Sequence, residues 1–283
     1  MRKLSTYLSF VRFSHSVFAL PFALTGALLA WRTEAFSWWQ VVWIAICMVA
    51  ARCAAMGFNR LVDARWDRLN PRTAGRELPT GRLGRGEAVA FVVVATLVFL
   101  FGAWRLSPLC LALAPVALAI VFWYSLAKRY TTYTQLFLGL AMAVAPVGGW
   151  FAAGGRGGAE PWLLGLAIGL WVGGFDILYA CQDVEFDRRQ GLRSIPATFG
   201  VPAALAVSRT MHVATILVMG LVGWEAALPL PYAAGVAGVA LLLAYEQSLV
   251  RHDDLSQVAR AFDLNGWVGI LYFAMTALAL YVA

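Results

Sequence analysis

Charged residues are scarce in this chain of 283 residues: Asp, Glu, Lys and Arg together make up 13% of it, whereas 61% is hydrophobic. Soluble domains carry about 25% charged residues. A soluble fold of this length could not bury so many apolar side chains. The composition excludes a soluble protein and predicts an integral membrane protein.

Cysteine and histidine are also rare, with four and three copies. The cysteines are Cys47, Cys53, Cys110 and Cys181. All lie inside or at the ends of apolar stretches without metal-ligand spacing, so we interpret them as small buried residues. We interpret His15, in the first apolar stretch, as a packing residue rather than a base. Asn265, in the last apolar stretch, is expected to form hydrogen bonds between helices.

Long apolar runs, in contrast, fill most of the sequence. A membrane-spanning helix needs about 20 mostly apolar residues, and the alternating pattern of a membrane barrel is absent. We predict an all-α, polytopic membrane bundle of about nine transmembrane helices that forms a single domain over residues 1–283. The predicted spans are 14–32, 38–58, 87–105, 107–127, 132–153, 161–181, 201–223, 229–250 and 264–283.

The basic residues are distributed unevenly between the predicted loops. Arg32, Arg105 and Arg156 fall in alternate loops, and almost all other Lys and Arg residues lie on the opposite side or in helix turns close to it. Basic loops mark the cytoplasmic side, which predicts an inner-membrane protein with a cytoplasmic N-terminus and, after an odd number of spans, an external C-terminus. The net charge of +7 thus reflects topology, and no nucleic-acid partner is expected.

A first acidic motif, "NRLVDARWD" (59–67), follows the second apolar run. Residues four apart share a helix face, so Asn59, Asp63 and Asp67 form one stripe if the helix continues past the membrane surface. Arg52 lies seven residues before Asn59, on the same side and about two turns deeper. Like charges four apart destabilise a helix by a few tenths of a kcal/mol, so helix stability gives no reason for this stripe.

A second acidic motif, "DILYACQDVEFDRRQG" (176–191), follows the sixth apolar run. Tyr179, Asp183 and Asp187 are spaced i, i+4 and i+8, which predicts a second stripe. Asp176 lies deeper in the span, where a charged side chain costs about 2.5–3.5 kcal/mol on insertion scales, and we therefore count it among the candidate substrate-binding residues. The two motifs share an apolar helix, a D-x-x-x-D end and following arginines, which indicates a weak internal repeat.

A single D-x-x-x-D at a helix end is more often a solvated face that pairs with nearby basic residues. Two copies on the same membrane side favour a divalent cation, and carboxylate oxygens suit Mg²⁺ together with water and phosphate. Arg72 and Arg76 lie in the Gly- and Pro-containing loop between the motifs. They can bind phosphate oxygens, although such a loop can also simply contact lipid headgroups. Together these parts predict a site for a diphosphate with a long hydrocarbon tail.

These motifs resemble those of the UbiA-type superfamily of membrane prenyltransferases over nearly the whole chain. "NRLVDARWD" is similar to the family's first aspartate motif, "RTAGRELPTG" to the loop that follows it, "YSLAKR" to a Y-x-x-x-K-R element, and "YACQDVEFDRRQGLRSIPATFG" to the second aspartate motif. Arg60 and Glu77 depart from the pattern, at positions where the family often has an acidic residue and a proline. "RFSHSVFALPFALTGALLA" looks most like the bacterial branch that prenylates hydroxyaromatic acids.

The resemblance implies an aromatic prenyltransferase of quinone biosynthesis, with cytoplasmic loops that cap its active site. Its donor would be a polyprenyl diphosphate and its acceptor a small hydroxyaromatic acid, 4-hydroxybenzoate or 1,4-dihydroxy-6-naphthoate. Two Mg²⁺ ions would be held by the four aspartates of the motifs. The implied site residues are Asn59 as a metal ligand or an orienting residue, Arg72, Arg76, Lys128 and Arg129 for the diphosphate, Arg52 for the acceptor carboxylate, and Tyr179 beside the allylic cation.

Two other classes remain open at this point. A membrane transporter also carries buried charges and internal repeats, but its polar residues are expected near mid-span on interrupted helices. In this chain the carboxylates cluster at one membrane face. A UbiA-type enzyme with another acceptor, such as haem or a lipid glycerol, has the same motifs and differs only in the group that attacks the allylic carbon.

Overall fold

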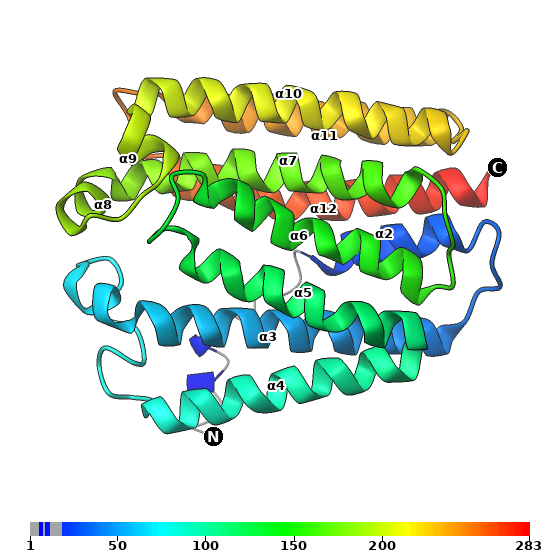
Figure 1. Cartoon of the computed structure of the whole chain (residues 1–283). Helices are drawn as coiled ribbons and strands as arrows, with labels where there is room; N and C mark the ends of the chain where they lie inside the picture. The colour runs from blue at the N-terminus through cyan, green and yellow to red at the C-terminus, as the bar shows by residue number, and fades with distance from the viewer. Residues whose placement is uncertain (1–5, 8, 12–18) are drawn as a thin grey trace. The chain divides into compact units, whose positions relative to one another are not determined.

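The computed structural model describes residues 6, 7, 9–11 and 19–283, and in this part of the chain it is all-helical apart from one isolated β-bridge (Figure 1). The chain divides into two compact units. The first unit contains the residues up to 20 together with 38–126, and the second contains 21–37 and 127–283. The predicted all-α architecture is confirmed.

Three long helices build the first unit: α3 (Trp38–Leu69), α4 (Arg85–Leu106) and α5 (Pro108–Ala127). α3 and α4 pack along each other, and their backbones approach closely because Gly57 leaves room for the side chain of Val92. The turn between α4 and α5 is set locally. Ser107 has an extended backbone there, and its Oγ accepts a hydrogen bond of 3.1 Å from the Cys110 N–H, which satisfies a backbone donor in the first turn of α5.

Six longer helices form the frame of the second unit. They are α2 (Leu20–Ala30), α6 (Thr134–Ala152), α7 (Glu160–Ala180), α10 (Val201–Glu225), α11 (Leu230–Leu249) and α12 (Val258–Tyr281). α7 packs against both α6 and α10, and α11 packs against α12, as Figure 1 shows. Glycines permit the closest approaches: Gly149 of α6 faces the backbone carbonyl of Ala23 in α2, and Gly139 of α6 faces that of Gly169 in α7.

Buried polar side chains of the second unit bind one another across helices. The indole N–H of Trp171 donates to Asn265 Oδ1 at 2.8 Å, and Asn265 Nδ2 donates to Glu246 Oε1 at 3.3 Å. These contacts join α7, α11 and α12, and they confirm the predicted interhelical role of Asn265. Close by, the side chain of Gln247 contacts His212 Nδ1 at 3.0 Å. Apolar surroundings make such pairing necessary, because an unpaired polar group in hydrocarbon is costly.

Seven helical segments among the described residues are long and apolar enough to cross a membrane. They are Trp38–Leu69, Arg85–Leu106, Pro108–Ala127, Thr134–Ala152, Glu160–Gln190, Val201–Glu225 and Val258–Tyr281. α2 is a shorter apolar helix, and residues 14–18 of the span predicted at 14–32 lie outside the described residues. α11 is not among the seven and carries Glu246 and Gln247 near its end. The chain is a multi-pass membrane protein, but the predicted count of nine spans is not confirmed.

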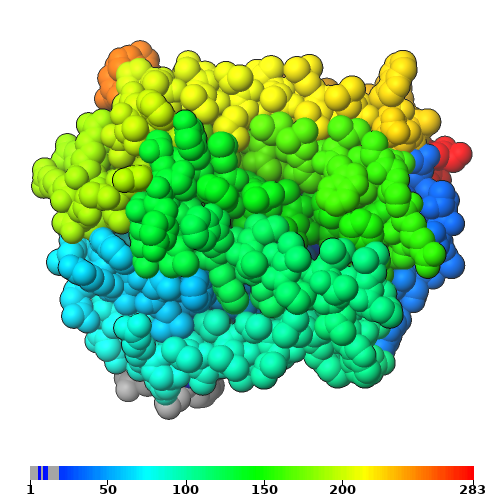
Figure 2. All heavy atoms as spheres, in the orientation of Figure 1, coloured from blue at the N-terminus to red at the C-terminus, as the bar shows by residue number. Residues whose placement is uncertain are grey.

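Apolar side chains also cover the outer faces of these helices. Val94 and Leu97 of α4 are exposed, and so are Val213 and Leu217 of α10. Figure 2 shows the atoms that these helices contribute to the surface. Exposed apolar residues repeated along a whole helix are expected where the surrounding solvent is lipid.

The segment 182–200, which lies between the predicted spans 161–181 and 201–223, contains two short helices. These are α8 (Val184–Gln190) and α9 (Ile195–Phe199). α8 ends at Gly191, whose φ of 66° is the left-handed conformation that glycine adopts readily. α9 begins after Ser194, whose side chain accepts a hydrogen bond from the Ala197 N–H. Local capping thus orders a segment that hydropathy alone leaves as a loop.

Candidate functional site

α3 continues without a break to Leu69, so Asn59, Asp63 and Asp67 lie on one helix face as predicted. The Asn59 side-chain amide contacts Asp63 Oδ2 at 3.5 Å. Asp63 is 3% exposed and Asp67 is 6% exposed. Two carboxylates are therefore held side by side with little access to water. We expect such groups to have cationic partners, because an unpaired buried charge is strongly unfavourable.

Asp67 has such a partner within the first unit. Arg76 Nη1 donates to both of its carboxylate oxygens, at 2.7 Å to Oδ1 and 2.9 Å to Oδ2. Thr73 Oγ1 also donates to the backbone carbonyl of Asp67 at 3.1 Å. The sequence predicted Arg76 as a phosphate ligand, whereas the structure pairs it with a predicted metal ligand. This contact was missed because the chain between the two residues is irregular.

The connection from α3 to α4, which we name the 70–84 loop, has no regular helix, as predicted. It starts with a turn in which the Arg72 N–H donates to Asn70 Oδ1 at 3.0 Å, and the Arg72 side chain is exposed. Glu77 is buried in the loop and accepts a 2.6 Å hydrogen bond from Ser9 Oγ. The Arg82 side chain donates to the carbonyl of Gly75. The loop therefore has a defined path beside the first acidic motif.

The second acidic motif lies in the second unit, where the predicted continuous stripe is wrong. α7 ends at Ala180, and a 3₁₀ turn (η2, Cys181–Asp183) separates it from α8. A 3₁₀ turn rotates about 120° per residue instead of about 100°, which turns Asp183 and Asp187 relative to Asp176 and Tyr179. Asp183 itself has φ −104° and ψ 7°, outside the helical region.

Contacts around the second motif hold it in place. Ser194 Oγ donates to Asp187 Oδ2 at 3.1 Å, and the Leu192 N–H donates to the Asp187 carbonyl at 2.9 Å. The same Ser194 hydroxyl caps α9, so one residue ends the turn and orients a predicted metal ligand. A Ser-x-Pro sequence is a recognisable helix start, and this signal could have identified Ser194 in the sequence.

Lys128 and Arg129, the end of the Y-x-x-x-K-R element, lie in the second unit together with the second motif. The carbonyl of Lys128 accepts a 2.8 Å hydrogen bond from the Arg193 N–H, and Arg193 Nη1 donates to the carbonyl of Tyr130 at 2.9 Å. Lys128 also lies close enough to Asp176 for the two charges to interact. The structure thus brings Lys128 and its neighbour Arg129 to the segment that carries Asp183 and Asp187.

The remaining predicted residues are placed as follows. Arg52 is half-buried on α3, about two turns before Asn59. The ring of Tyr179 packs against Phe262 at a centroid distance of 5.2 Å, at the end of a row of aromatic rings that continues through Phe175 to Trp171. His15 lies outside the described residues.

The donor atoms of each motif fit Mg²⁺ better than a metal that needs a complete protein cage. Among the described residues, no three His, Cys, Asp or Glu side chains form a metal-binding group. Mg²⁺ is usually bound through one or two carboxylates, with water and substrate phosphate completing its shell. Each motif offers two aspartates of this kind. At Asp67, a metal ion must compete with Arg76 for the same two oxygens.

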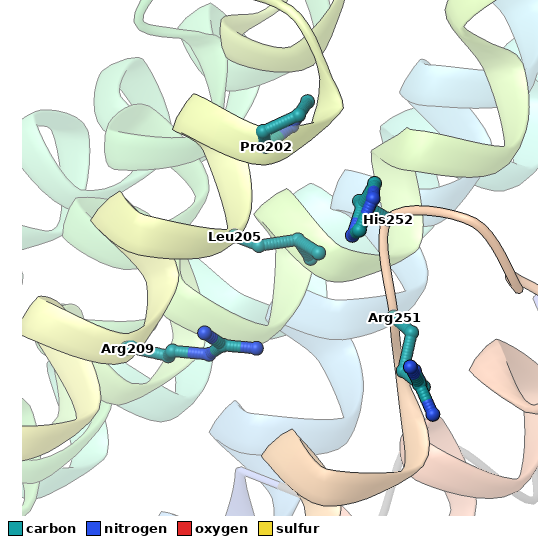
Figure 3. A pocket seen from close by; sticks show the side chains of 5 residues that line it. All are labelled: Pro202, Leu205, Arg209, Arg251 and His252. Carbon is teal, nitrogen blue, oxygen red and sulfur yellow. The ribbon is translucent and has the colours of Figure 1, made fainter.

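A cavity of about 230 Å³ lies elsewhere in the second unit and contains none of the predicted site residues. Pro202, Leu205 and Arg209 of α10 line one side, and Arg251 and His252 line the other (Figure 3). It shares no residue with either acidic motif, so the candidate site is defined by the motifs.

Curated proteins with similar sequences carry one name. A protein from Tolumonas auensis named 4-hydroxybenzoate octaprenyltransferase is 32% identical over 228 residues, which are 81% of this chain and 79% of that relative. A protein of the same name from Marinobacter nauticus is 34% identical over 230 residues, covering 81% of this chain and 78% of the relative.

Solved structures share the fold. The apo structure of a UbiA homolog from Aeropyrum pernix K1 matches with a TM-score of 0.86 at 34% identity, over 94% of this chain and 98% of that chain. A UbiA homolog from Archaeoglobus fulgidus bound to DMAPP and Mg²⁺ matches with a TM-score of 0.76 at 20% identity, over 98% of this chain and all of that one, a likeness of fold alone. The model of the UbiA prenyltransferase family matches residues 19–282. The chain belongs to the UbiA prenyltransferase family.

Proposed function

We propose that this protein transfers a polyprenyl group from an allylic polyprenyl diphosphate to a hydroxyaromatic carboxylic acid. The acceptor is 4-hydroxybenzoate in ubiquinone biosynthesis or 1,4-dihydroxy-6-naphthoate in menaquinone biosynthesis. The observation that carries the proposal is the buried acidic face of α3, where Asn59, Asp63 and Asp67 lie together in a chain of this family. The curated relatives named 4-hydroxybenzoate octaprenyltransferase support the acceptor class.

Each acidic motif would hold one Mg²⁺ ion. Asp63 and Asp67 bind the first, with Asn59 as a further ligand or as the group that orients Asp63, and Asp183 and Asp187 bind the second. Mg²⁺ supplies positive charge that stabilises the diphosphate as it leaves.

Basic side chains also stabilise the leaving diphosphate. Arg72 in the 70–84 loop is exposed, and a guanidinium can bind two phosphate oxygens at once. Lys128 and Arg129 act from the segment that is bonded to Arg193. These fixed charges lower the barrier to breaking the allylic C–O bond, because negative charge grows on the leaving group in the transition state.

The acceptor would be oriented by its carboxylate on Arg52. The ring carbon beside its phenolic oxygen attacks the allylic carbon as the C–O bond breaks, and the ring then loses a proton to a carboxylate or to the released diphosphate. The ring of Tyr179 can face the allylic cation, an interaction of about 0.5–2 kcal/mol. Tyr179 lies on α7 about one turn after Asp176.

We also propose that the two units act as a single domain, since one family model covers both. The excess of basic residues in one set of loops supports an inner-membrane location, a cytoplasmic N-terminus and an active site that faces the cytoplasm.

The proposal is tested with purified protein, Mg²⁺, an allylic diphosphate and a panel of 4-hydroxybenzoate, dihydroxynaphthoates, haem and a glycerol lipid. Mass spectrometry should find a prenylated hydroxyaromatic acid, and EDTA should abolish it. Prenylated haem or glycerol lipid without the aromatic product would replace the proposed acceptor. If no diphosphate is released with any acceptor, the transporter alternative is favoured instead.

A further inference from the structure

The ion pair between Arg76 and Asp67 holds the 70–84 loop in place, and it also bears on how the first acidic motif binds its ligands. We propose that Arg76 occupies the Asp67 carboxylate as an internal cation until the donor diphosphate arrives, so that Mg²⁺ and diphosphate bind this motif cooperatively. The inference rests on the proposed function, because it takes Asp67 to be a metal ligand.

The geometry places the guanidinium where a chelated cation would sit. A single nitrogen, Nη1, donates to both Asp67 oxygens at 2.7 and 2.9 Å. A divalent ion bound by the same carboxylate uses those same lone pairs, so Arg76 and the ion exclude each other there. A guanidinium has five N–H groups, and two of them are on Nη1. The other three, on Nε and Nη2, are suited to binding phosphate oxygens.

Burial couples the replacement of Arg76 by Mg²⁺ at Asp67 to the binding of the diphosphate. The Asp67 side chain is 9% exposed, and that of Arg76 is 22% exposed. Removing the partner from a buried carboxylate is strongly unfavourable, so Arg76 leaves easily only if another cation replaces it. Conversely, Mg²⁺ alone would displace the half-buried Arg76 guanidinium and leave it without an anion. A diphosphate supplies that anion, so the two ligands together satisfy both groups.

The loop can permit this exchange without unfolding. Its neighbouring anchors do not use the Arg76 side chain: Thr73 Oγ1 binds the Asp67 carbonyl, and the Leu83 N–H binds the Glu77 carbonyl at 3.2 Å. Glu77 is in turn held by Ser9. The guanidinium can therefore move while the backbone on both sides stays in place.

The test measures metal binding rather than turnover. Mn²⁺ is titrated into the purified full-length protein in detergent and followed by electron paramagnetic resonance, with and without a non-reactive allylic thiodiphosphate. In Arg76→Gln without the thiodiphosphate, we expect Mn²⁺ to bind about fivefold or more tightly than in the wild type, the lower end of typical coupling between sites. Arg76→Lys keeps the charge but loses the planar guanidinium, so its Mn²⁺ affinity should lie between those of the wild type and Arg76→Gln.

The coupling itself gives the second readout. The thiodiphosphate should increase Mn²⁺ affinity by a larger factor in the wild type than in Arg76→Gln, because only the wild type gains from moving Arg76 to the phosphate. Arg82→Gln is the matched control, since Arg82 lies in the same loop but bonds to the Gly75 carbonyl and the Thr80 hydroxyl. It should behave like the wild type.

A purely structural ion pair predicts the opposite sign. If Arg76→Gln binds Mn²⁺ as weakly as the wild type, or more weakly, the counter-ion role of Arg76 is wrong. Asp67→Asn separates this outcome from a failure of the proposed function. If Asp67→Asn binds Mn²⁺ like the wild type when the thiodiphosphate is present, Asp67 is not a metal ligand and the assignment of the first motif is lost, whatever Arg76 does.

Discussion

Asp63 combines deep burial with a position beside Asn59. We expect Asp63→Asn to lower the rate of diphosphate release by about a hundredfold or more, because a group that stabilises charge in the transition state is lost. The rate is measured with saturating Mg²⁺ and donor. Asp253→Asn is the control, since Asp253 is exposed and forms only a loose pair with Arg251. Activity within twofold of the wild type in Asp63→Asn would contradict the metal assignment.

Arg52 offers a separate prediction about the acceptor. Arg52→Ala should raise the KM for 4-hydroxybenzoate by about 10- to 100-fold, because a hydrogen bond to a charged group contributes about 1.5–3 kcal/mol. A neutral analogue, 4-hydroxybenzamide, should show a much smaller change. Steady-state kinetics with both acceptors decide the matter, and an equal effect on the acid and the amide would assign Arg52 to another role.

At the residue scale, the sequence predicted which side chains share the α3 face but not what they contact. Spacing along a regular helix determines the neighbours of Asp63, so Asn59 was correctly expected beside it. The partner of Asp67 is nine residues away, across a turn that contains Pro71. No periodicity relates residues across such a turn, which is why Arg76 was assigned to phosphate alone.

The helices themselves were predictable to different degrees. The segment from Asn59 to Leu69 contains neither glycine nor proline, so the continuation of α3 followed from ordinary helix preference. The 3₁₀ turn at Cys181–Asp183 contains no helix-breaking residue either, and it therefore could not be inferred. It lies where α7 and α8 pack against α9 in the second unit.

Helix α6 provides a test of packing at the element scale. A methyl group on Gly149 would collide with the Ala23 carbonyl of α2, whereas one on Gly148 would meet nothing within 4 Å. We expect Gly149→Ala to destabilise the protein by about 1–3 kcal/mol. Gly148→Ala, on the exposed side of the same helix, should be neutral or stabilising by up to about 1 kcal/mol. Thermal unfolding in one detergent compares the two variants, and equal melting temperatures would contradict the close approach of α2 and α6.

For the whole molecule, the distribution of basic residues predicts a sidedness that labelling can test. Arg156 precedes α7 and Arg189 lies in α8 after it, and both are exposed. In a background without the four native cysteines, a cysteine at position 189 should react with an impermeant maleimide only in inverted vesicles. A cysteine at position 156 should react in intact cells. The reverse pattern would place the acidic motifs outside the cytoplasm.

The count of spans was the least predictable property of the whole chain. Hydropathy gave nine apolar runs, and seven helical segments among the described residues meet the length and composition of a span. α11 differs from its predicted run because buried Glu246 and half-buried Gln247 lower its apolar character, while hydrogen bonds pair them within the second unit. Average hydropathy cannot recognise polar residues that are paired within a bundle.

The length of α3 has a consequence for how the enzyme would meet its donor. Its 32 residues span about 48 Å at about 1.5 Å per residue, well beyond a hydrocarbon core of about 30 Å. Trp38 and Trp39 are exposed at its first turn, as expected of residues at a lipid–water boundary. If α3 enters the bilayer at these tryptophans, Asp63 and Asp67 are expected at the depth of the phospholipid headgroups. A long isoprenoid could thus enter by lateral diffusion from the surrounding leaflet and present its diphosphate while its chain stays in the hydrocarbon core of the bilayer.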